Sequence, residues 1–89
     1  MVRQHLLIKG SVQGVSYRKS TKRVAEELRV NGWVRNLPSG EVEACLEGPA
    51  SAVAALTQWC HQGPPRSTVE TVVVKLEEFR AEFERFEIR

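Results

Sequence analysis

The chain has 89 residues, of which 42% are hydrophobic and 27% are charged, and its formal net charge is +2 at pH 7. This length suits one modest hydrophobic core, so we expect residues 1–89 to form a single domain. No apolar run approaches the roughly 20 residues of a membrane span, and so small a net charge gives no general argument for binding nucleic acid or a membrane surface.

The first predicted element is a short apolar strand over residues 4–9, which stops at Gly10. From Gly10 to Arg18 the chain then reads Gly-Ser-Val-Gln-Gly-Val-Ser-Tyr-Arg, a stretch that we call the glycine loop. Glycine adopts positive φ without steric penalty, so Gly10 and Gly14 allow the backbone to curve until successive N–H groups point at one spot. This pattern predicts an anion-binding loop.

A helix is predicted to begin at Tyr17 and to end near Asn31-Gly32, since Asn and Gly commonly terminate helices. Its buried face is expected to carry residues at three- and four-residue steps: Tyr17, Thr21, Val24, Ala25 and Leu28.

The opening half of this helix is basic, with four cations before the first acid: Arg18, Lys19, Lys22 and Arg23. Cations oppose the helix dipole there, and we expect the last three to be solvated surface charges. Arg18 differs, because its planar guanidinium lies where it can bind two phosphate oxygens beside the helix N-terminus.

A hairpin is predicted next, with strands over residues 32–36 and 41–48 joined through a Leu-Pro-Ser-Gly turn. The second strand alternates apolar with other residues, a pattern typical of a sheet with one solvated face. The positions expected to face inward are Val42, Ala44 and Leu46, and those expected to face solvent are Glu41, Glu43, Cys45 and Glu47.

A second helix is predicted from Gly48-Pro49 to Gly63-Pro64-Pro65, with an inner stripe of Val53, Leu56 and Cys60. A strand over residues 69–76 follows, and Phe83, Phe86 and Ile88 indicate a short closing strand. Residues 77–84 fit either a loop or a helical turn. This order predicts an α+β protein with the ferredoxin-like split βαβ sandwich (βαββαβ), in which two helices cover one face of an antiparallel sheet.

Metal and cysteine chemistry find no support in the residue spacing. His5 and His61 lie in different predicted elements, and no His, Cys, Asp or Glu cluster has metal-ligand spacing, so we expect no metal and no cofactor. The N-terminus lacks the apolar segment and cleavage site of a signal peptide, so we expect a cytoplasmic protein. Cys45 and Cys60 are therefore interpreted as small packing residues rather than a disulfide pair.

A site with one fixed cation, many N–H donors and no acid still suits phosphoryl transfer, which depends mainly on positioning and charge neutralisation. The missing acid restricts the substrate. A carboxylate leaving an acyl phosphate needs no proton because its pKa is about 4, whereas an alkoxide would need a general acid or a metal. The absence of a base likewise requires a neutral amide to hold the attacking water. Asn36 is our candidate, although an Asn before such a turn is also a common turn residue.

Two segments carry a specific family resemblance. The glycine loop and the stretch Gly32-Trp-Val-Arg-Asn-Leu-Pro-Ser-Gly-Glu-Val42 closely resemble the two signatures of the acylphosphatase family. The similarity extends over nearly the whole chain, including the entry and exit of the second predicted helix and the final Phe86-x-Ile88.

This resemblance implies an acylphosphatase: a ferredoxin-like enzyme that cleaves acyl phosphates to a carboxylate and inorganic phosphate without a metal. In the family, the arginine at the place of Arg18 binds the phosphoryl group and the asparagine at the place of Asn36 orients the attacking water. The resemblance also implies that the phosphoryl group is bound by the loop residues Gln13, Gly14, Val15, Ser16, Tyr17 and Arg18. We expect a monomer whose partners are a small acyl phosphate and inorganic phosphate, the latter as product and inhibitor.

Three other functions deserve comparison. An RNA recognition motif shares the order of elements, but residues 41–47 offer three glutamates and no aromatic ring for base stacking. A non-catalytic phosphate or acyl-phosphate sensor would have the same loop, and turnover separates it from an enzyme. Hydrogenase-maturation proteins begin with a related domain, but this chain has no cysteine-rich extension.

Overall fold

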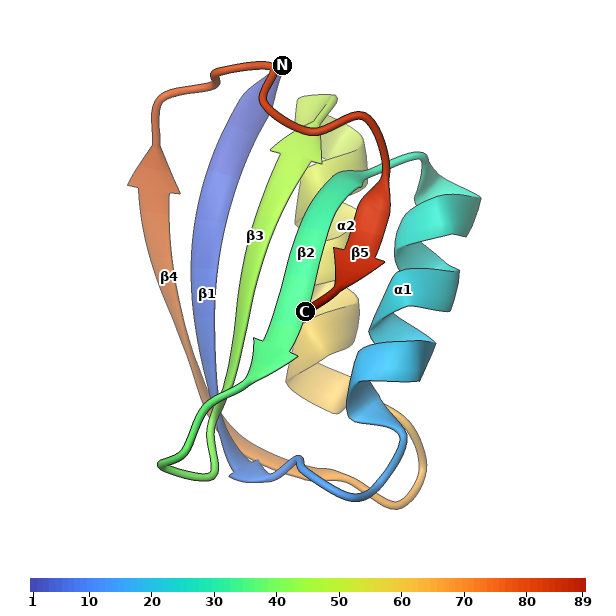
Figure 1. Cartoon of the computed structure of the whole chain (residues 1–89), viewed down its shortest axis with the longest axis vertical. Coiled ribbons are helices and arrows are strands. Elements are labelled where there is room, and N and C mark those ends of the chain that lie inside the picture. Colours follow the sequence, from blue (N-terminus) through green and yellow to red (C-terminus); the bar gives the residue numbers. More distant parts are fainter.

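The computed structural model describes residues 1–89 and contains five strands and two helices (Figure 1). In chain order they are β1 (Val2–Ser11), α1 (Tyr17–Leu28), β2 (Asn31–Asn36), β3 (Val42–Gly48), α2 (Ala50–Gln62), β4 (Thr68–Glu77) and β5 (Phe86–Ile88). The strands form one sheet in the order β4-β1-β3-β2-β5, and both helices lie on the same face of it. The predicted ferredoxin-like βαββαβ order is confirmed. Neither helix is long and apolar enough to cross a membrane.

The predicted antiparallel pairing holds for β1 to β4, whereas β5 lies parallel to β2. The register places Ile88 beside Val34, and the N–H of Arg89 donates to the Val34 carbonyl at 2.8 Å. The sheet is therefore mixed. This parallel pairing brings the C-terminal residues to the edge of β2, near the end of that strand where Asn36 lies.

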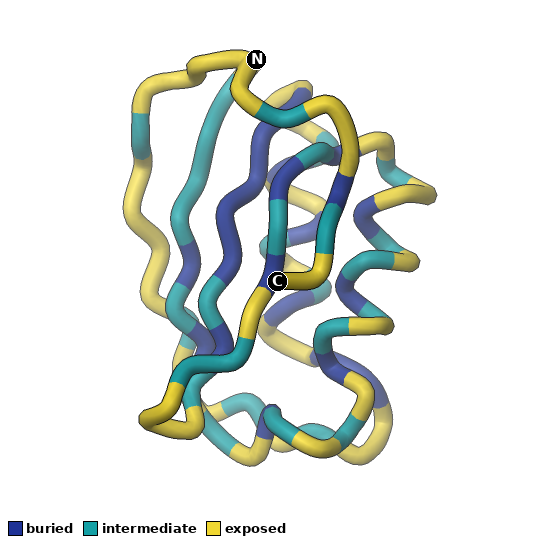
Figure 2. The backbone as a smooth tube through the Cα atoms, in the orientation of Figure 1, coloured by how far each residue is buried: buried dark blue, intermediate teal, exposed yellow.

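The core lies between the sheet and the two helices. It contains 14 buried apolar residues, and Figure 2 shows that burial is densest along β3. The predicted inner stripe of α2 is buried, and α1 buries Tyr17, Thr21 and Ala25 while Val24 and Leu28 pack at the margin. Cys45 and Cys60 are free and buried, and burial raises their pKa values to about 11 and about 12. Both therefore remain neutral thiols that fill space.

The predicted end of the first helix is wrong by three residues. α1 stops at Leu28, and Arg29 takes the left-handed conformation with φ 60° while its N–H bonds to the last turn. Gly32 serves another purpose: its φ is 143°, and a Cβ there would lie 1.9 Å from the Cys45 carbonyl oxygen. Asn31 and Gly32 therefore begin β2, where the glycine allows β2 to approach β3 closely.

The prediction that Glu47 lies on a solvated face of β3 is wrong, whereas Cys45 is buried, as its interpretation as a packing residue predicts. Cys45 and Glu47 are only 1% and 2% exposed. β3 has a neighbour on both sides, and the segment between β4 and β5 passes over its end, where backbone N–H groups contact the Glu47 carboxylate. That segment, residues 78–85, contains no helix, so of the two alternatives left open for residues 77–84, a loop or a helical turn, the structure shows the loop.

The buried Glu47 carboxylate fastens this C-terminal segment to the sheet. It accepts the N–H groups of Arg80 and Glu82, each at 2.9 Å, and lies 3.4 Å from Arg3. Burial acts to raise the pKa of Glu47, but the two N–H groups and the guanidinium outweigh it, so this pKa lies below its ordinary value of 4.5. A lowered carboxyl pKa stabilises the fold above pH 4.5, and that contribution is lost as the pH falls through the folded pKa.

We expect Glu47→Gln to lower the free energy of unfolding at pH 7 by roughly 2–3 kcal/mol, because buried donors lose a charged acceptor. Urea denaturation monitored by circular dichroism measures this change. The matched control is Glu78→Gln, since Glu78 is exposed and forms no side-chain hydrogen bond or ion pair. Equal stability of the two variants at pH 7, or an equal acid dependence of Glu47→Gln and the native protein, would contradict the role of Glu47.

Candidate active site

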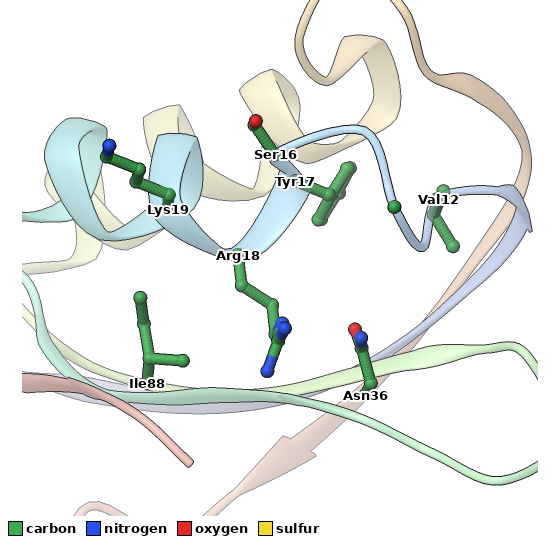
Figure 3. Close-up of a pocket in the computed structure, with 8 residues that line it drawn as sticks. Val12, Ser16, Tyr17, Arg18, Lys19, Asn36 and Ile88 are labelled. Atoms are coloured by element: carbon green, nitrogen blue, oxygen red, sulfur yellow. The ribbon is translucent and has the colours of Figure 1, made fainter.

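A small pocket lies where the loop between β1 and α1 meets the ends of β2 and β5. Its volume is about 160 Å³. The residues that line it are Val12, Gly14, Ser16, Tyr17, Arg18, Lys19, Asn36 and Ile88, and Figure 3 shows them around one opening. The two residues predicted to be catalytic, Arg18 and Asn36, therefore lie in the same pocket although 18 positions separate them in the sequence.

The β1–α1 loop, residues 12–16, curves through two left-handed residues. Gly14 has φ 74° and Ser16 has φ 63°. A Cβ at Gly14 would meet nothing within 4 Å, so glycine is required there by its backbone conformation and not by lack of space. Ser16 precedes α1 without a side-chain cap, and the first turn contains no acidic residue. The first N–H groups of α1 are therefore left without side-chain acceptors beside the pocket.

The expectation that Gly10 helps to form the anion-binding curve is wrong. Gly10 belongs to β1 and lies at an irregularity in its pairing with β4. With φ 135°, a Cβ at this position would lie 2.1 Å from the Thr68 carbonyl oxygen. Gly10 thus serves the close approach of two strands, and of the two loop glycines only Gly14 lines the pocket.

Arg18 supplies the fixed positive charge of the pocket. Its side chain leaves the first turn of α1 toward the side on which Asn36 lies (Figure 3). Arg18 forms neither an ion pair nor a side-chain hydrogen bond, so its five N–H donors remain free to bind an anion.

Of the other basic residues of α1, Lys19 and Arg23 are exposed as predicted for surface charges, and Lys22 is partly buried. Arg23 is exposed and pairs with Glu27 at 3.3 Å, one helical turn away. Lys19 was not predicted in the site, yet it lines the pocket, although its ammonium group points away from Arg18 and Asn36 in Figure 3.

Asn36 brings an unpaired acceptor to the pocket. It is the last residue of β2, and its side chain lies across from the Arg18 guanidinium (Figure 3). Its Oδ1 atom is buried and has no hydrogen-bond partner, and it is alone in this among the buried side-chain N and O atoms of the chain. Because most buried polar atoms find partners, such an exception calls for an explanation. A donor from a bound molecule would satisfy this oxygen, which makes Asn36 a candidate binding residue.

Three predicted loop residues differ in what their side chains do. Tyr17 donates its hydroxyl to the Cys60 carbonyl at 2.8 Å, and burial raises its pKa far above the ordinary value. This neutral phenol therefore fastens the start of α1 to α2. Val15 packs at the margin of the core and does not line the pocket. The Gln13 side chain also lies outside the pocket lining and bonds to two carbonyls of the β2–β3 turn, residues 37–41.

Sequence reasoning missed Val12, Lys19 and Ile88 among the pocket residues. Val12 and Lys19 lie next to predicted site residues, so proximity in the chain was an available signal. Ile88 carried none, because its place in the site depends on the parallel pairing of β5 with β2. Neither histidine enters the pocket: His5 Nε2 lies 2.7 Å from Glu43, and His61 contacts the Thr57 carbonyl on α2.

Comparison with known proteins agrees with this geometry. The family model described as Acylphosphatase matches residues 4–88. An acylphosphatase of Geobacter metallireducens is 47% identical over 88 residues, which cover 99% of this chain and 95% of the relative. One from Pyrobaculum islandicum is 52% identical over 88 residues, covering 98% of this chain and 93% of the relative.

Solved structures give the same result. The crystal structure of an acylphosphatase from Bacillus subtilis superposes with a TM-score of 0.96 at 30% identity, covering 100% of this chain and 99% of that one. An acylphosphatase from Coxiella burnetii gives a TM-score of 0.94 at 35% identity, covering 99% of this chain and 92% of that one. With its two signature segments joined in one pocket, this chain belongs to the acylphosphatase family and is an enzyme that hydrolyses acyl phosphates.

Proposed function

We propose that Arg18 and the backbone N–H groups of residues 13–18 bind the phosphoryl group, and that Asn36 orients the attacking water. The observation that carries this proposal is the unpaired, buried Oδ1 of Asn36 in the pocket that also contains the free Arg18 guanidinium. One residue neutralises the phosphoryl charge and the other directs the nucleophile. No metal and no cofactor take part in this proposal.

The binding half of the site follows from charge and donor geometry. A phosphoryl dianion meets the guanidinium, the curved backbone around Gly14 and the positive end of the α1 dipole. The backbone donors are held by the loop and by α1 before substrate arrives, so they need little reorganisation as charge shifts among the phosphoryl oxygens. The guanidinium can form two parallel bonds to these oxygens, which fixes orientation as well as position.

The reacting half requires no titrating group. Water donates a hydrogen bond to Asn36 Oδ1, and its oxygen forms a bond to phosphorus while the bond from phosphorus to the acyl oxygen breaks. The acyl group leaves as a carboxylate, which is stable without protonation because its pKa is about 4. The water proton passes to a phosphate oxygen or to solvent. This account fits a pocket lined by no aspartate, glutamate or histidine.

We further propose that residues 1–89 act as a single-domain cytoplasmic monomer, with inorganic phosphate as product and competitive inhibitor. The continuous core between the sheet and the helices supports the single domain. Against nucleic acid binding, Glu43 and Glu47 lie on the central strand facing away from the helices, where RNA-binding sheets need aromatic rings. Trp33, the aromatic residue on neighbouring β2, lies beneath Arg35 and Arg89.

The native protein is expected to hydrolyse benzoyl phosphate at an undiminished rate in EDTA, with competitive inhibition by inorganic phosphate. Ultraviolet absorbance follows the loss of benzoyl phosphate directly. Complete loss of activity on chelation, restored by a divalent cation, would contradict a metal-free reaction.

Arg18→Lys should reduce kcat/KM by roughly 100-fold, because one ammonium group cannot reproduce two parallel bonds to the phosphoryl group. Steady-state kinetics with benzoyl phosphate measures the effect. Arg23→Lys is the matched control on the same helix, since Arg23 is exposed and pairs only with Glu27. Near-native kcat/KM in Arg18→Lys would show that charge alone is enough and would exclude the paired contact.

Asn36→Ala should lower kcat by about 100-fold while the inhibition constant for phosphate changes little, because the water loses its acceptor and the anion keeps its donors. Comparing the change in kcat with the change in the phosphate inhibition constant separates a role in orienting water from a role in binding the phosphoryl group. Asn31→Ala, at the opposite end of β2, controls for the loss of a bonded side-chain amide from this strand, since Asn31 Nδ2 donates to the Phe83 carbonyl at 3.2 Å. An unchanged kcat in Asn36→Ala would remove this residue from the reaction.

A further inference from the structure

We propose that Gln13 is a positioning residue that fixes Asn36 relative to the phosphate-binding loop. This inference rests on the proposed roles of Arg18 and Asn36, and it adds a role for the Gln13 side chain, which touches neither substrate nor water. The relevant atoms are the two N–H donors of one side-chain amide, which connect the β1–α1 loop to the β2–β3 turn.

The bonds of this amide are specific. Gln13 Nε2 donates to the Leu37 carbonyl at 2.8 Å and to the Glu41 carbonyl at 2.9 Å. Those two carbonyls also close the turn itself, since the Leu37 N–H donates to Glu41 at 2.8 Å and the Gly40 N–H to Leu37 at 3.1 Å. The amide therefore binds both sides of the turn at the point where the chain leaves β2 and enters β3.

Both ends of this connection adjoin the proposed site. Gln13 directly precedes Gly14 in the pocket, and Leu37 directly follows Asn36. β1 and β2 are not neighbours in the sheet, because β3 lies between them. Backbone ladders join these strands only through β3, where Val42 pairs with both Ile8 and Asn36. The Gln13 amide adds a direct bond from the loop itself to the turn that follows Asn36.

The other polar link from β1 to this turn is much weaker. Lys9 Nζ lies 3.7 Å from Glu41 Oε2, and the Lys9 side chain is half exposed. Exposed ion pairs contribute little and tolerate changes of geometry. The two short bonds of Gln13 are partly buried, so they determine the separation more sharply than the charge pair does.

The chemistry of the contact explains why glutamine suits this position. Two carbonyl acceptors require a group with two N–H donors, which a primary amide provides. Alanine offers no donor, and glutamate places carboxylate oxygens against carbonyl oxygens. Because the amide supports the turn beside Asn36, its loss should impair water placement more than phosphate binding.

The decisive experiment is a double-mutant cycle with benzoyl phosphate as the substrate. Gln13→Ala should lower kcat by roughly 10-fold or more through misplacement of Asn36, while the inhibition constant for inorganic phosphate changes less than about 3-fold. In the Asn36→Ala background the same change should alter kcat less than about 2-fold, because the group that it positions is gone. Fully additive effects, or equal loss of kcat and phosphate binding, would overturn the proposal.

Gln13→Glu supplies a readout that a merely structural role would not change. At pH 7 its carboxylate faces two carbonyls, so kcat should fall at least as far as in Gln13→Ala. As the pH falls toward about 5, protonation restores one donor, and kcat relative to the native enzyme should rise. Gln4→Glu is the matched control, because Gln4 uses its side-chain oxygen as acceptor for Thr57 on α2 and keeps an acceptor when changed. Parallel pH profiles of Gln13→Glu and the native enzyme would contradict the proposal.

Failure of this inference differs from failure of the proposed function. If Arg18→Ala and Asn36→Ala both hydrolyse benzoyl phosphate like the native protein, the proposed residue roles are wrong. If those variants lose activity while Gln13→Ala keeps native kcat, the site stands and the positioning role of Gln13 is overturned. Thermal unfolding of each variant ensures that folded proteins are compared.

Discussion

A free guanidinium and an unpaired amide oxygen share one small pocket, and the rest of the structure keeps them there. Arg18 has no carboxylate partner, and Asn36 Oδ1 is buried without a hydrogen bond. The unpaired amide oxygen costs stability, because proteins normally pair their buried acceptors with donors. Together the two groups leave a free donor set and a free acceptor in one pocket, which is what the roles proposed for Arg18 and Asn36 require.

The sheet topology explains how so short a chain assembles this arrangement. α1 begins beside the pocket because the β1–α1 loop curves at Gly14 and Ser16. β3 pairs antiparallel with both β1 and β2, so β1 and β2 run in the same direction. The β2–β3 turn therefore lies next to the end of β1, and β2 ends at the same pocket. The parallel pairing of β5 adds Ile88 as an apolar wall. Three segments distant in the chain thus meet at one end of the sheet.

The sequence predicted those parts of the structure that depend on local chemistry. Hydrophobic patterns located both helices and all five strands, including the short closing strand, and the donor pattern of the glycine loop pointed to Arg18. Family resemblance and the need for a neutral water-holding group pointed to Asn36. The errors lie where distant segments meet. Gly10 and Gly32 serve close strand contacts, and the burial of Glu47 depends on a segment more than 30 residues away. Periodicity within one segment contains no information on such neighbours, and the same limit hid Ile88 and the cross-link made by Gln13.

Stability and function are concentrated at opposite ends of the sheet. Around the pocket, Ser16 adopts a left-handed backbone, α1 opens without a cap or an acid, and Asn36 carries an unpaired atom. Left-handed non-glycine residues cost roughly 1–2 kcal/mol each, and they occur at both ends: Ser16 beside the pocket, and Arg29 and Ala81 near Glu47. At the other end, Glu47 satisfies two backbone N–H groups and Arg3, and Arg3 also pairs with Glu77 at 2.9 Å and Glu82 at 2.7 Å.

This division has a physical reason in a chain with one small core. Strain at the pocket is tolerated only if contacts elsewhere keep the native state well populated. The Glu47 contacts hold Arg80 and Glu82 in the segment through which the chain returns from β4 to β5. The pairing of β5 with β2 then sets the place of Ile88. A carboxylate remote from the pocket therefore holds the segment that leads to the C-terminal strand, and that strand's own pairing brings it to the pocket.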